Sequence, residues 1–126
     1  MIPLFEGKVS AGFPSSAENY IDKSLDLNEL LIAHPAATFF IRVKGNSMVN
    51  AGIRSQDILI VDRARAVTNN KIVIARIYDE LTVKRISIEG DNIYLMPDND
   101  EYKPIEITDS MDFEIWGVVT FVIHQL

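Results

Sequence analysis

The chain has 126 residues, a length that favours a single domain. With 48% hydrophobic and 24% charged residues, it has enough apolar side chains to bury a core and is not a disordered polyelectrolyte. A net charge of -6 argues against a surface that binds by neutralising phosphates, and the lack of cysteine excludes disulfides, thiolate metal sites and cysteine catalysis.

No membrane segment, metal or cofactor is expected. The longest apolar runs, such as residues 58–61, are far shorter than the ~20 residues that cross a bilayer. The amino-terminal residues lack the basic and apolar segments of a secretory signal, so a cytoplasmic location is predicted. The sequence has two histidines, no HExxH spacing and no glycine-rich phosphate cradle.

Residues 1–24 are predicted to form an extended, mobile arm, because glycines, prolines and serines interrupt isolated apolar residues there. The arm contains the dipeptide Ala11-Gly12, followed by Phe13 and Pro14. This composition fits a plain flexible linker, and it equally fits a segment whose small side chains let its backbone lie close to another group. Residues 25–126 are predicted to form the folded domain.

A short helix is predicted over residues 27–32. Three leucines match one helical face, and Asp26 can cap the free N–H groups at the start of the helix. Pro35 ends the helix, because the residue before a proline disfavours the α region.

The pattern then changes to the alternation of a strand with one face on the core. Phe39, Ile41 and Val43 alternate with Phe40 and two basic residues. Further strands are predicted at residues 57–62, 71–78, 81–88, 92–96 and 112–123. Short, closely spaced strands with few helices predict a mainly β fold, a compact antiparallel sheet or partly closed barrel.

Ser47 stands in Gly45-Asn46-Ser47-Met48, directly after the first strand predicted in the domain, and one helical turn is predicted after it. Such a junction can expose a hydroxyl beside free backbone N–H groups, an arrangement that stabilises an oxyanion. An ordinary turn uses the same residue types. The motif alone leaves both interpretations open.

Lys84 lies on a predicted strand, where Thr82, Ile86 and Ile88 share its face and are expected to be buried. Burial lowers the pKa of a lysine, and a neutral Lys84 in contact with Ser47 could take its proton. In the alternative interpretation, the stem lies along the sheet and the ammonium reaches water. Arg85, on the opposite face, is predicted to be a solvated charge.

The other candidate groups fit catalysis less well. His34 precedes a proline and His124 lies near the carboxyl end, so both are predicted to be structural or exposed rather than members of a Ser-His-Asp triad. The acidic segment 98–101 lacks the glycine and terminal glutamate of a calcium loop and is predicted to be a solvated turn. Serine with lysine is the better catalytic pair.

Five segments carry a resemblance to a known family, in order and spacing. They are Ser10-Ala11-Gly12-Phe13-Pro14-Ser15, residues 25–38, Gly45-Asn46-Ser47-Met48, residues 57–62 and Thr82-Val83-Lys84. Together they closely resemble the UmuD-like proteins of the bacterial DNA-damage (SOS) response, relatives of LexA-type repressors and of the S24 serine peptidases. The resemblance covers nearly the whole chain.

The resemblance implies a self-cleaving serine peptidase with the LexA/UmuD carboxyl-terminal fold. Ser47 would be the nucleophile, Lys84 the general base and acid, and Ala11-Gly12 the bond that is cut. It also implies a homodimer, activation by RecA filaments on single-stranded DNA, and a trimmed product that serves a Y-family, UmuC-like polymerase in error-prone translesion synthesis. Because no helix-turn-helix domain precedes the arm, direct sequence-specific DNA binding is not expected.

Two other functions remain open. One is an interaction module that serves a polymerase while its serine and lysine stay idle. The other is a general peptidase akin to type I signal peptidases, which also pair serine with lysine but are anchored in a membrane, and this chain shows no anchor.

Overall fold

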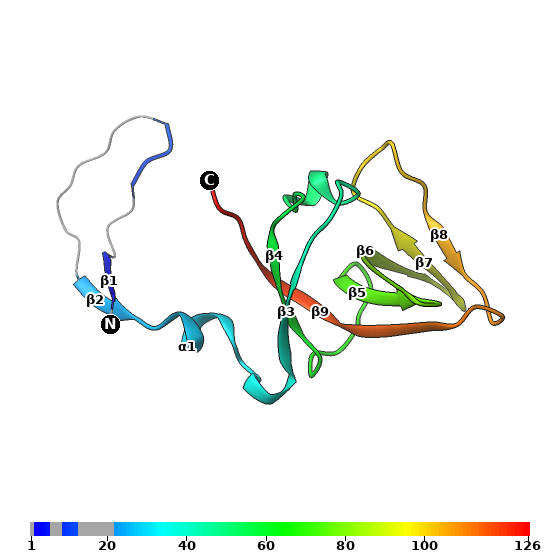
Figure 1. The fold of residues 1–126 in the computed structure, drawn as a ribbon, viewed down its shortest axis with the longest axis horizontal. Coiled ribbons are helices and arrows are strands. Elements are labelled where there is room, and N and C mark those ends of the chain that lie inside the picture. Colours follow the sequence, from blue (N-terminus) through cyan, green and yellow to red (C-terminus); the bar gives the residue numbers. More distant parts are fainter. Residues whose placement is uncertain (1, 6–8, 13–21) are drawn as a thin grey trace. The chain divides into compact units, whose positions relative to one another are not determined.

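The computed structural model describes residues 2–5, 9–12 and 22–126, and it divides into two units, residues 1–33 and 34–126 (Figure 1). In the first unit, β1 (Ile2–Phe5) pairs with β2 (Asp22–Leu25) in an antiparallel sheet. Helix α1 (Leu27–Leu31) follows. The Asp26 carboxylate accepts a hydrogen bond of 2.9 Å from the Asn28 N–H, which confirms the predicted helix and its cap.

The strand pair of the first unit was not predicted. The sequence analysis placed residues 1–24 in an extended, mobile arm, and the boundary after residue 24 stays a prediction. Residues 6–8 and 13–21 of that arm lie outside the described residues.

The second unit is a single antiparallel sheet of seven strands in the order β3-β4-β9-β5-β6-β7-β8. After the 3-10 turn η1 (Pro35–Ala37), the strands are β3 (Thr38–Arg42), β4 (Ile58–Asp62), β5 (Ile72–Ile77), β6 (Glu80–Glu89), β7 (Asn92–Met96), β8 (Ile105–Ile107) and β9 (Phe113–Ile123). The edge strands β3 and β8 do not pair with each other, so the sheet is not closed. This confirms the predicted mainly β fold; only β8 was missed in this unit.

Strand β9 joins the two halves of the sheet (Figure 1). Its first part pairs with β5 and its last part with β4, and each ladder contains a register shift that bends the strand. Gly117 lies where β9 approaches β4: a Cβ there would be 2.7 Å from Val61 Cγ1 and 3.2 Å from the Asp62 carbonyl oxygen. Only glycine fits this close approach.

The core lies in two apolar clusters on opposite faces of β5, since the consecutive residues Val73 and Ile74 belong to different clusters. The buried members of the first are Val43, Met48, Ile53, Leu59, Val61 and Ile74, and those of the second are Val73, Ala75, Ile86, Leu95 and Val118. Burial of one such aliphatic side chain contributes about 1.5–3 kcal/mol. The alternation predicted for residues 39–44 is confirmed, because Val43 is buried while Phe40 is exposed.

The expected burial of Ile88 is wrong, since its side chain is 38% exposed. The ladder between β5 and β6 ends at Ile72 opposite Arg85, and beyond it the loop residues 69–71 rather than a strand bond to β6 on that side. Ile88 thus lies near the end of β6, flanked by β7 on one side and by the Asn69 side chain on the other.

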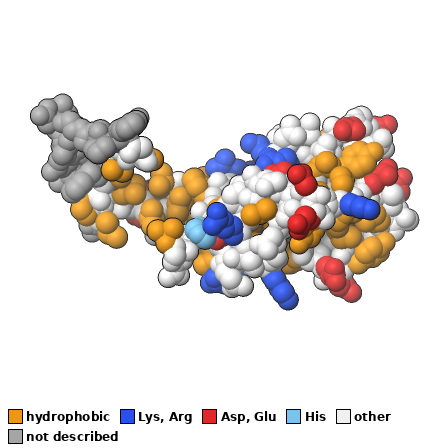
Figure 2. Space-filling model, turned by 90° about the horizontal axis from the view of Figure 1, so that it is seen from above, with side chains coloured by type: hydrophobic (Ala, Val, Ile, Leu, Met, Phe, Trp, Pro, Cys, Tyr) orange, Lys and Arg blue, Asp and Glu red, His pale blue; other side chains and the backbone are white. Residues whose placement is uncertain are grey.

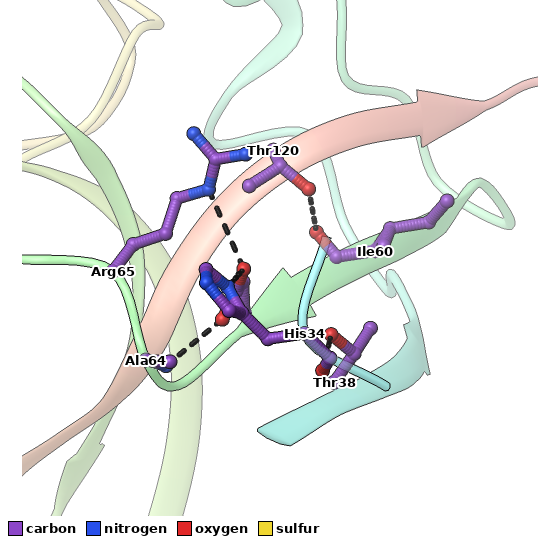
Figure 3. Close-up of polar contacts among 7 residues, drawn as sticks. His34, Thr38, Ile60, Ala64, Arg65 and Thr120 are labelled. Carbon is purple, nitrogen blue, oxygen red and sulfur yellow. Dashed lines mark hydrogen bonds and ion pairs between the residues drawn. The ribbon is translucent and has the colours of Figure 1, made fainter. Parts of the chain in front are cut away.

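Two buried aspartates fix the ends of β4. The Asp62 carboxylate lies 2.6 Å from His34 Nδ1 and accepts a hydrogen bond of 2.8 Å from the Ala64 N–H (Figure 3). At the other end, Asp57 lies 2.6 Å from His124 Nδ1. Burial alone raises the pKa of both carboxyls, but backbone and histidine hydrogen bonds outweigh it and hold each pKa below its usual range. Both histidines are therefore structural, as predicted.

The surface carries mixed charges. On the face shown in Figure 2, basic, acidic and apolar side chains of residues 34–126 are interspersed, and no continuous basic area forms there. Among the described residues, no helix combines the length and the apolar character that crossing a membrane requires.

Candidate active site

Ser47 lies on the bend that connects β3 to η2 (Val49–Ala51). Gly45 has φ +94°, a left-handed conformation that favours glycine and lets the chain turn out of the strand. Met48 is only 1% exposed and anchors the segment in the first core cluster. The half-buried Ser47 is thus held between a glycine turn and a core side chain. The single helical turn predicted after it is confirmed as η2.

Lys84 lies on β6, opposite Val73 of β5, and is only 8% exposed. Its Nζ donates hydrogen bonds to Ser47 Oγ at 2.8 Å, to Thr82 Oγ1 at 2.9 Å and to the Val83 carbonyl oxygen at 3.2 Å. The fold therefore brings together two side chains that are 37 positions apart in the sequence. The interpretation in which the lysine ammonium reaches bulk water does not fit this burial.

Burial lowers the pKa of Lys84 below its ordinary value, because the charged form loses its hydration. The hydroxyls of Ser47 and Thr82 can act as donors or acceptors, so both can also bond to a neutral amine. The site therefore suits the uncharged form of the lysine, which is the form that accepts a proton.

Ser47 and Lys84 line a cavity of about 390 Å³. Its apolar wall consists of Ile41, Val43, Leu59, Ile74, Leu81 and Val83. A second hollow, of about 710 Å³, adjoins it and shares Leu81, Thr82, Lys84 and Tyr102 with it. The lysine thus stands between two connected hollows, a shape that can hold an extended peptide on both sides of a scissile bond.

Free backbone donors lie beside the serine. Among the described residues, neither the N–H of Ser47 nor that of Met48 has a hydrogen-bond acceptor, whereas the next N–H groups, of Val49 and Asn50, are bonded. Unused N–H groups next to a nucleophile are the donors that an oxyanion needs.

The segment 98–101 forms a turn in which Asp100 and Glu101 are exposed, as predicted, but Arg85 is not the solvated charge that the sequence analysis predicted. The Arg85 guanidinium bonds to the Asp98 carboxylate, with Nη2 at 2.7 Å and Nε at 3.1 Å. Both side chains are partly buried, at 34% and 26% exposed. The prediction for Arg85 was wrong because this residue pairs with Asp98, in the loop that follows the neighbouring strand β7.

The same loop holds the segment around Ser47, a role that the sequence analysis missed. The Asp98 carbonyl accepts a hydrogen bond of 2.8 Å from the Asn50 N–H, and the Asp98 N–H lies 3.3 Å from Met48 Sδ. The Asn99 side-chain amide donates to the Asn46 carbonyl at 2.8 Å. Two of these three contacts use backbone groups of Asp98, which leave no signature in the sequence.

Ala11 and Gly12 belong to the first unit, and both are exposed. The Gly12 N–H donates to Ser10 Oγ at 3.2 Å, and a Cβ added at Gly12 would meet no atom within 4 Å. Their role as a cleavage site stays a prediction.

No metal centre is evident within the described part of the chain, where no group of three or more His, Asp or Glu side chains is arranged to hold an ion.

A mainly β domain in which a buried lysine contacts a loop serine has the arrangement of serine peptidases that use lysine as their base. Residues 3–120 match the family described as Peptidase S24-like. The chain is 42% identical over 120 residues to Protein MucA of Salmonella typhimurium. The aligned region covers 94% of this chain and 82% of MucA. It is 43% identical over 131 residues to Protein ImpA of Escherichia coli, covering 98% and 83% of the two chains.

A repressor is also similar. Identity to the LexA repressor of Glaesserella parasuis is 42% over 125 residues, covering 98% of this chain and 59% of the repressor. The chain belongs to the S24 peptidase-like family, as one of its UmuD-like members of the bacterial SOS mutagenesis system. The predicted resemblance is thereby confirmed.

Proposed function

We propose that this chain is a self-cleaving serine endopeptidase of the SOS mutagenesis response, in which Ser47 and Lys84 cut the Ala11-Gly12 bond. The observation that carries the proposal is the contact of 2.8 Å between Lys84 Nζ and Ser47 Oγ, in a buried setting that lowers the pKa of the lysine. A serine hydroxyl is a weak nucleophile unless an adjacent base removes its proton.

Acylation begins when neutral Lys84 takes the proton of Ser47 as Oγ attacks the Ala11 carbonyl carbon. In this scheme the N–H groups of Ser47 and Met48, which have no acceptor among the described residues, donate hydrogen bonds to the resulting oxyanion. Lys84 then gives its proton to the nitrogen of Gly12, the C–N bond breaks, and residue 11 remains bound to Ser47 as an ester. Water, deprotonated by Lys84, hydrolyses the ester and restores the hydroxyl.

Thr82 has a positioning role in this scheme. Its hydroxyl bonds to Lys84 Nζ at 2.9 Å and so aims the amine at Ser47. Because the scissile bond belongs to the same polypeptide as the nucleophile, cleavage within one chain avoids a bimolecular encounter, which can contribute roughly 7–11 kcal/mol. Docking of the arm then controls the rate.

The direct test is the mass of the purified protein after incubation at pH 7 and at pH 10. We expect loss of residues 1–11, which leaves 115 residues (126 − 11), with a faster loss at pH 10 because more Lys84 is neutral. A chain that stays intact at both pH values while binding a polymerase subunit would instead support an interaction module with an idle serine and lysine.

The proposed partners follow from the UmuD-like family. A homodimer is supported by exposed apolar residues on β3 and at the end of β9, where Phe40 is 59%, Phe121 39% and Ile123 45% exposed. Equilibrium sedimentation tests it, and a monomer at micromolar concentration would contradict it.

Activation and partnership with a polymerase need their own tests. We propose that RecA filaments on single-stranded DNA accelerate cleavage in the cytoplasm, which a time course at pH 7 with and without filaments measures. We also propose that the trimmed form binds a Y-family, UmuC-like polymerase subunit, which co-purification tests. Equal cleavage rates with and without filaments would reject RecA filaments as the activator. Failure of the trimmed form to co-purify with the polymerase subunit would reject that partner.

A further inference from the structure

We propose that Arg85 and Asp98 form a brace that positions Ser47 against Lys84; this inference rests on the proposed function and deepens it. The brace is defined as the ion pair between these two side chains together with the loop contacts that Asp98 and Asn99 make. Neither residue touches the reacting atoms, so both are positioning residues.

One end of the brace is fixed to the strand that carries the lysine. Arg85 follows Lys84 directly on β6 and projects to the opposite face of the strand. Its guanidinium holds Asp98 Oδ2 through two nitrogens, at 2.7 Å and 3.1 Å, and its Nη1 donates to the Asn70 carbonyl at 2.8 Å. Three donors in one planar group fix the direction of the arginine more firmly than a single contact.

The other end holds the serine segment from both sides. Asn46, before Ser47, is bonded through its carbonyl to the Asn99 side chain at 2.8 Å. After Ser47, the Asn50 N–H donates to the Asp98 carbonyl at 2.8 Å. Ser47 therefore lies on a stretch of chain whose two flanks are tied to the same loop.

These contacts close a ring that contains the proposed nucleophile and base. From Lys84 the ring runs to Arg85, across the ion pair to Asp98, through the loop contacts to the Ser47 segment, and back by the bond of 2.8 Å between Ser47 and Lys84. Proton transfer requires a separation of about 2.6–3.2 Å, and a displacement of about 1 Å can slow a reaction roughly 100-fold. Because partly exposed ion pairs contribute little to stability, the brace should affect alignment more than folding.

The chain offers a matched control. Arg76 of β5 bonds to the Asp112 carboxylate at 3.1 Å, and it makes this pair with a loop that precedes β9 rather than with the loop that holds Ser47. The experiment compares the full-length variants Asp98→Ala and Arg85→Ala, singly and together, with Asp112→Ala. Asp98→Asn keeps the size of the side chain and one oxygen acceptor. It replaces Asp98→Ala in the comparison if the alanine variant does not fold.

Three readouts separate alignment from folding. The first is the rate of loss of residues 1–11 at pH 10, where a larger fraction of Lys84 is neutral than at pH 7. The second is the rate at which a fluorophosphonate labels Ser47, which does not depend on docking of the arm. The third is the thermal midpoint of unfolding.

We expect Asp98→Ala and Arg85→Ala each to lower both rates about 10- to 100-fold, with Asp98→Asn intermediate and Asp112→Ala unchanged. The double variant should lose no more than the worse single variant, because the two side chains act as one unit. The thermal midpoints of Asp98→Ala and Asp112→Ala should be similar.

Cleavage and labelling of Asp98→Ala at the rates of Asp112→Ala would overturn the brace. So would rate losses that multiply in the double variant. Wild-type protein that is labelled at Ser47 but not shortened would reject self-cleavage, while its labelling rates still decide on the brace. Wild-type protein that is neither labelled nor shortened would reject the proposed function, and the brace with it.

Discussion

Ser47→Ala and Lys84→Ala are each expected to leave the chain at its full length at both pH 7 and pH 10. Without Ser47 there is no nucleophile, and without Lys84 no other base in the described part of the chain is bonded to the Ser47 hydroxyl, since Thr82 offers only a hydroxyl. The loss of rate should be at least about 10⁴-fold, as found when one member of a catalytic unit is removed. Mass spectrometry over time measures it.

Lys84→Arg provides the matched control for charge. Arginine keeps a positive charge but is not deprotonated in this pH range, so it cannot act as the base. The wild-type rate should rise with pH and level off above the pKa of Lys84, which burial places below that of an ordinary lysine. Shortening of Lys84→Arg with the same rise in rate would show that another group is the base.

Gly12→Val is expected to lower self-cleavage at least about 100-fold without affecting the fold. A branched side chain next to the attacked carbonyl would keep the backbone from lying close to Ser47. In the resting structure a Cβ at Gly12 meets no atom within 4 Å, so the substitution has open space and folding should not change. The measurements are the cleavage rate at pH 10 and the thermal midpoint.

Gly7→Val is the control for this variant, since it makes the same change elsewhere in the amino-terminal segment. It should be shortened at the wild-type rate. If Gly12→Val were also shortened at that rate to the same product, the constraint on residue 12 would be rejected. A product of a different mass would place the scissile bond elsewhere.

The sequence was sufficient to predict helix α1 of the first unit and most strands of the second, because these elements carry local signals. Alternation over residues 39–44 marks one face of a strand, and Asp26 beside a leucine pattern marks the start of a helix. Strand β8 was missed because its three residues are too short to show a period and follow Pro104. The pairing of β1 with β2 was missed because breakers separate the two strands and their register depends on contacts distant in the sequence.

The site was predictable to the extent that its residues form motifs. The expected contact of Ser47 with Lys84 is present at 2.8 Å, while the catalytic roles stay proposals. The support around it was not predictable. Asp98 acts on the Met48 segment, 50 positions away, through its backbone, and every residue type has the same backbone donor and acceptor.

The most direct measurement is the pKa of Lys84, obtained by recording the NMR chemical shift of its Cε as a function of pH. The Ser47→Ala variant is used because it cannot shorten itself during the titration. We predict a midpoint below the ordinary lysine value of about 10.4, because burial removes hydration from the charged amine. The rate of wild-type cleavage should rise over the same pH range. A Lys84 that titrates at or above the ordinary value would contradict a neutral lysine as the base that activates Ser47.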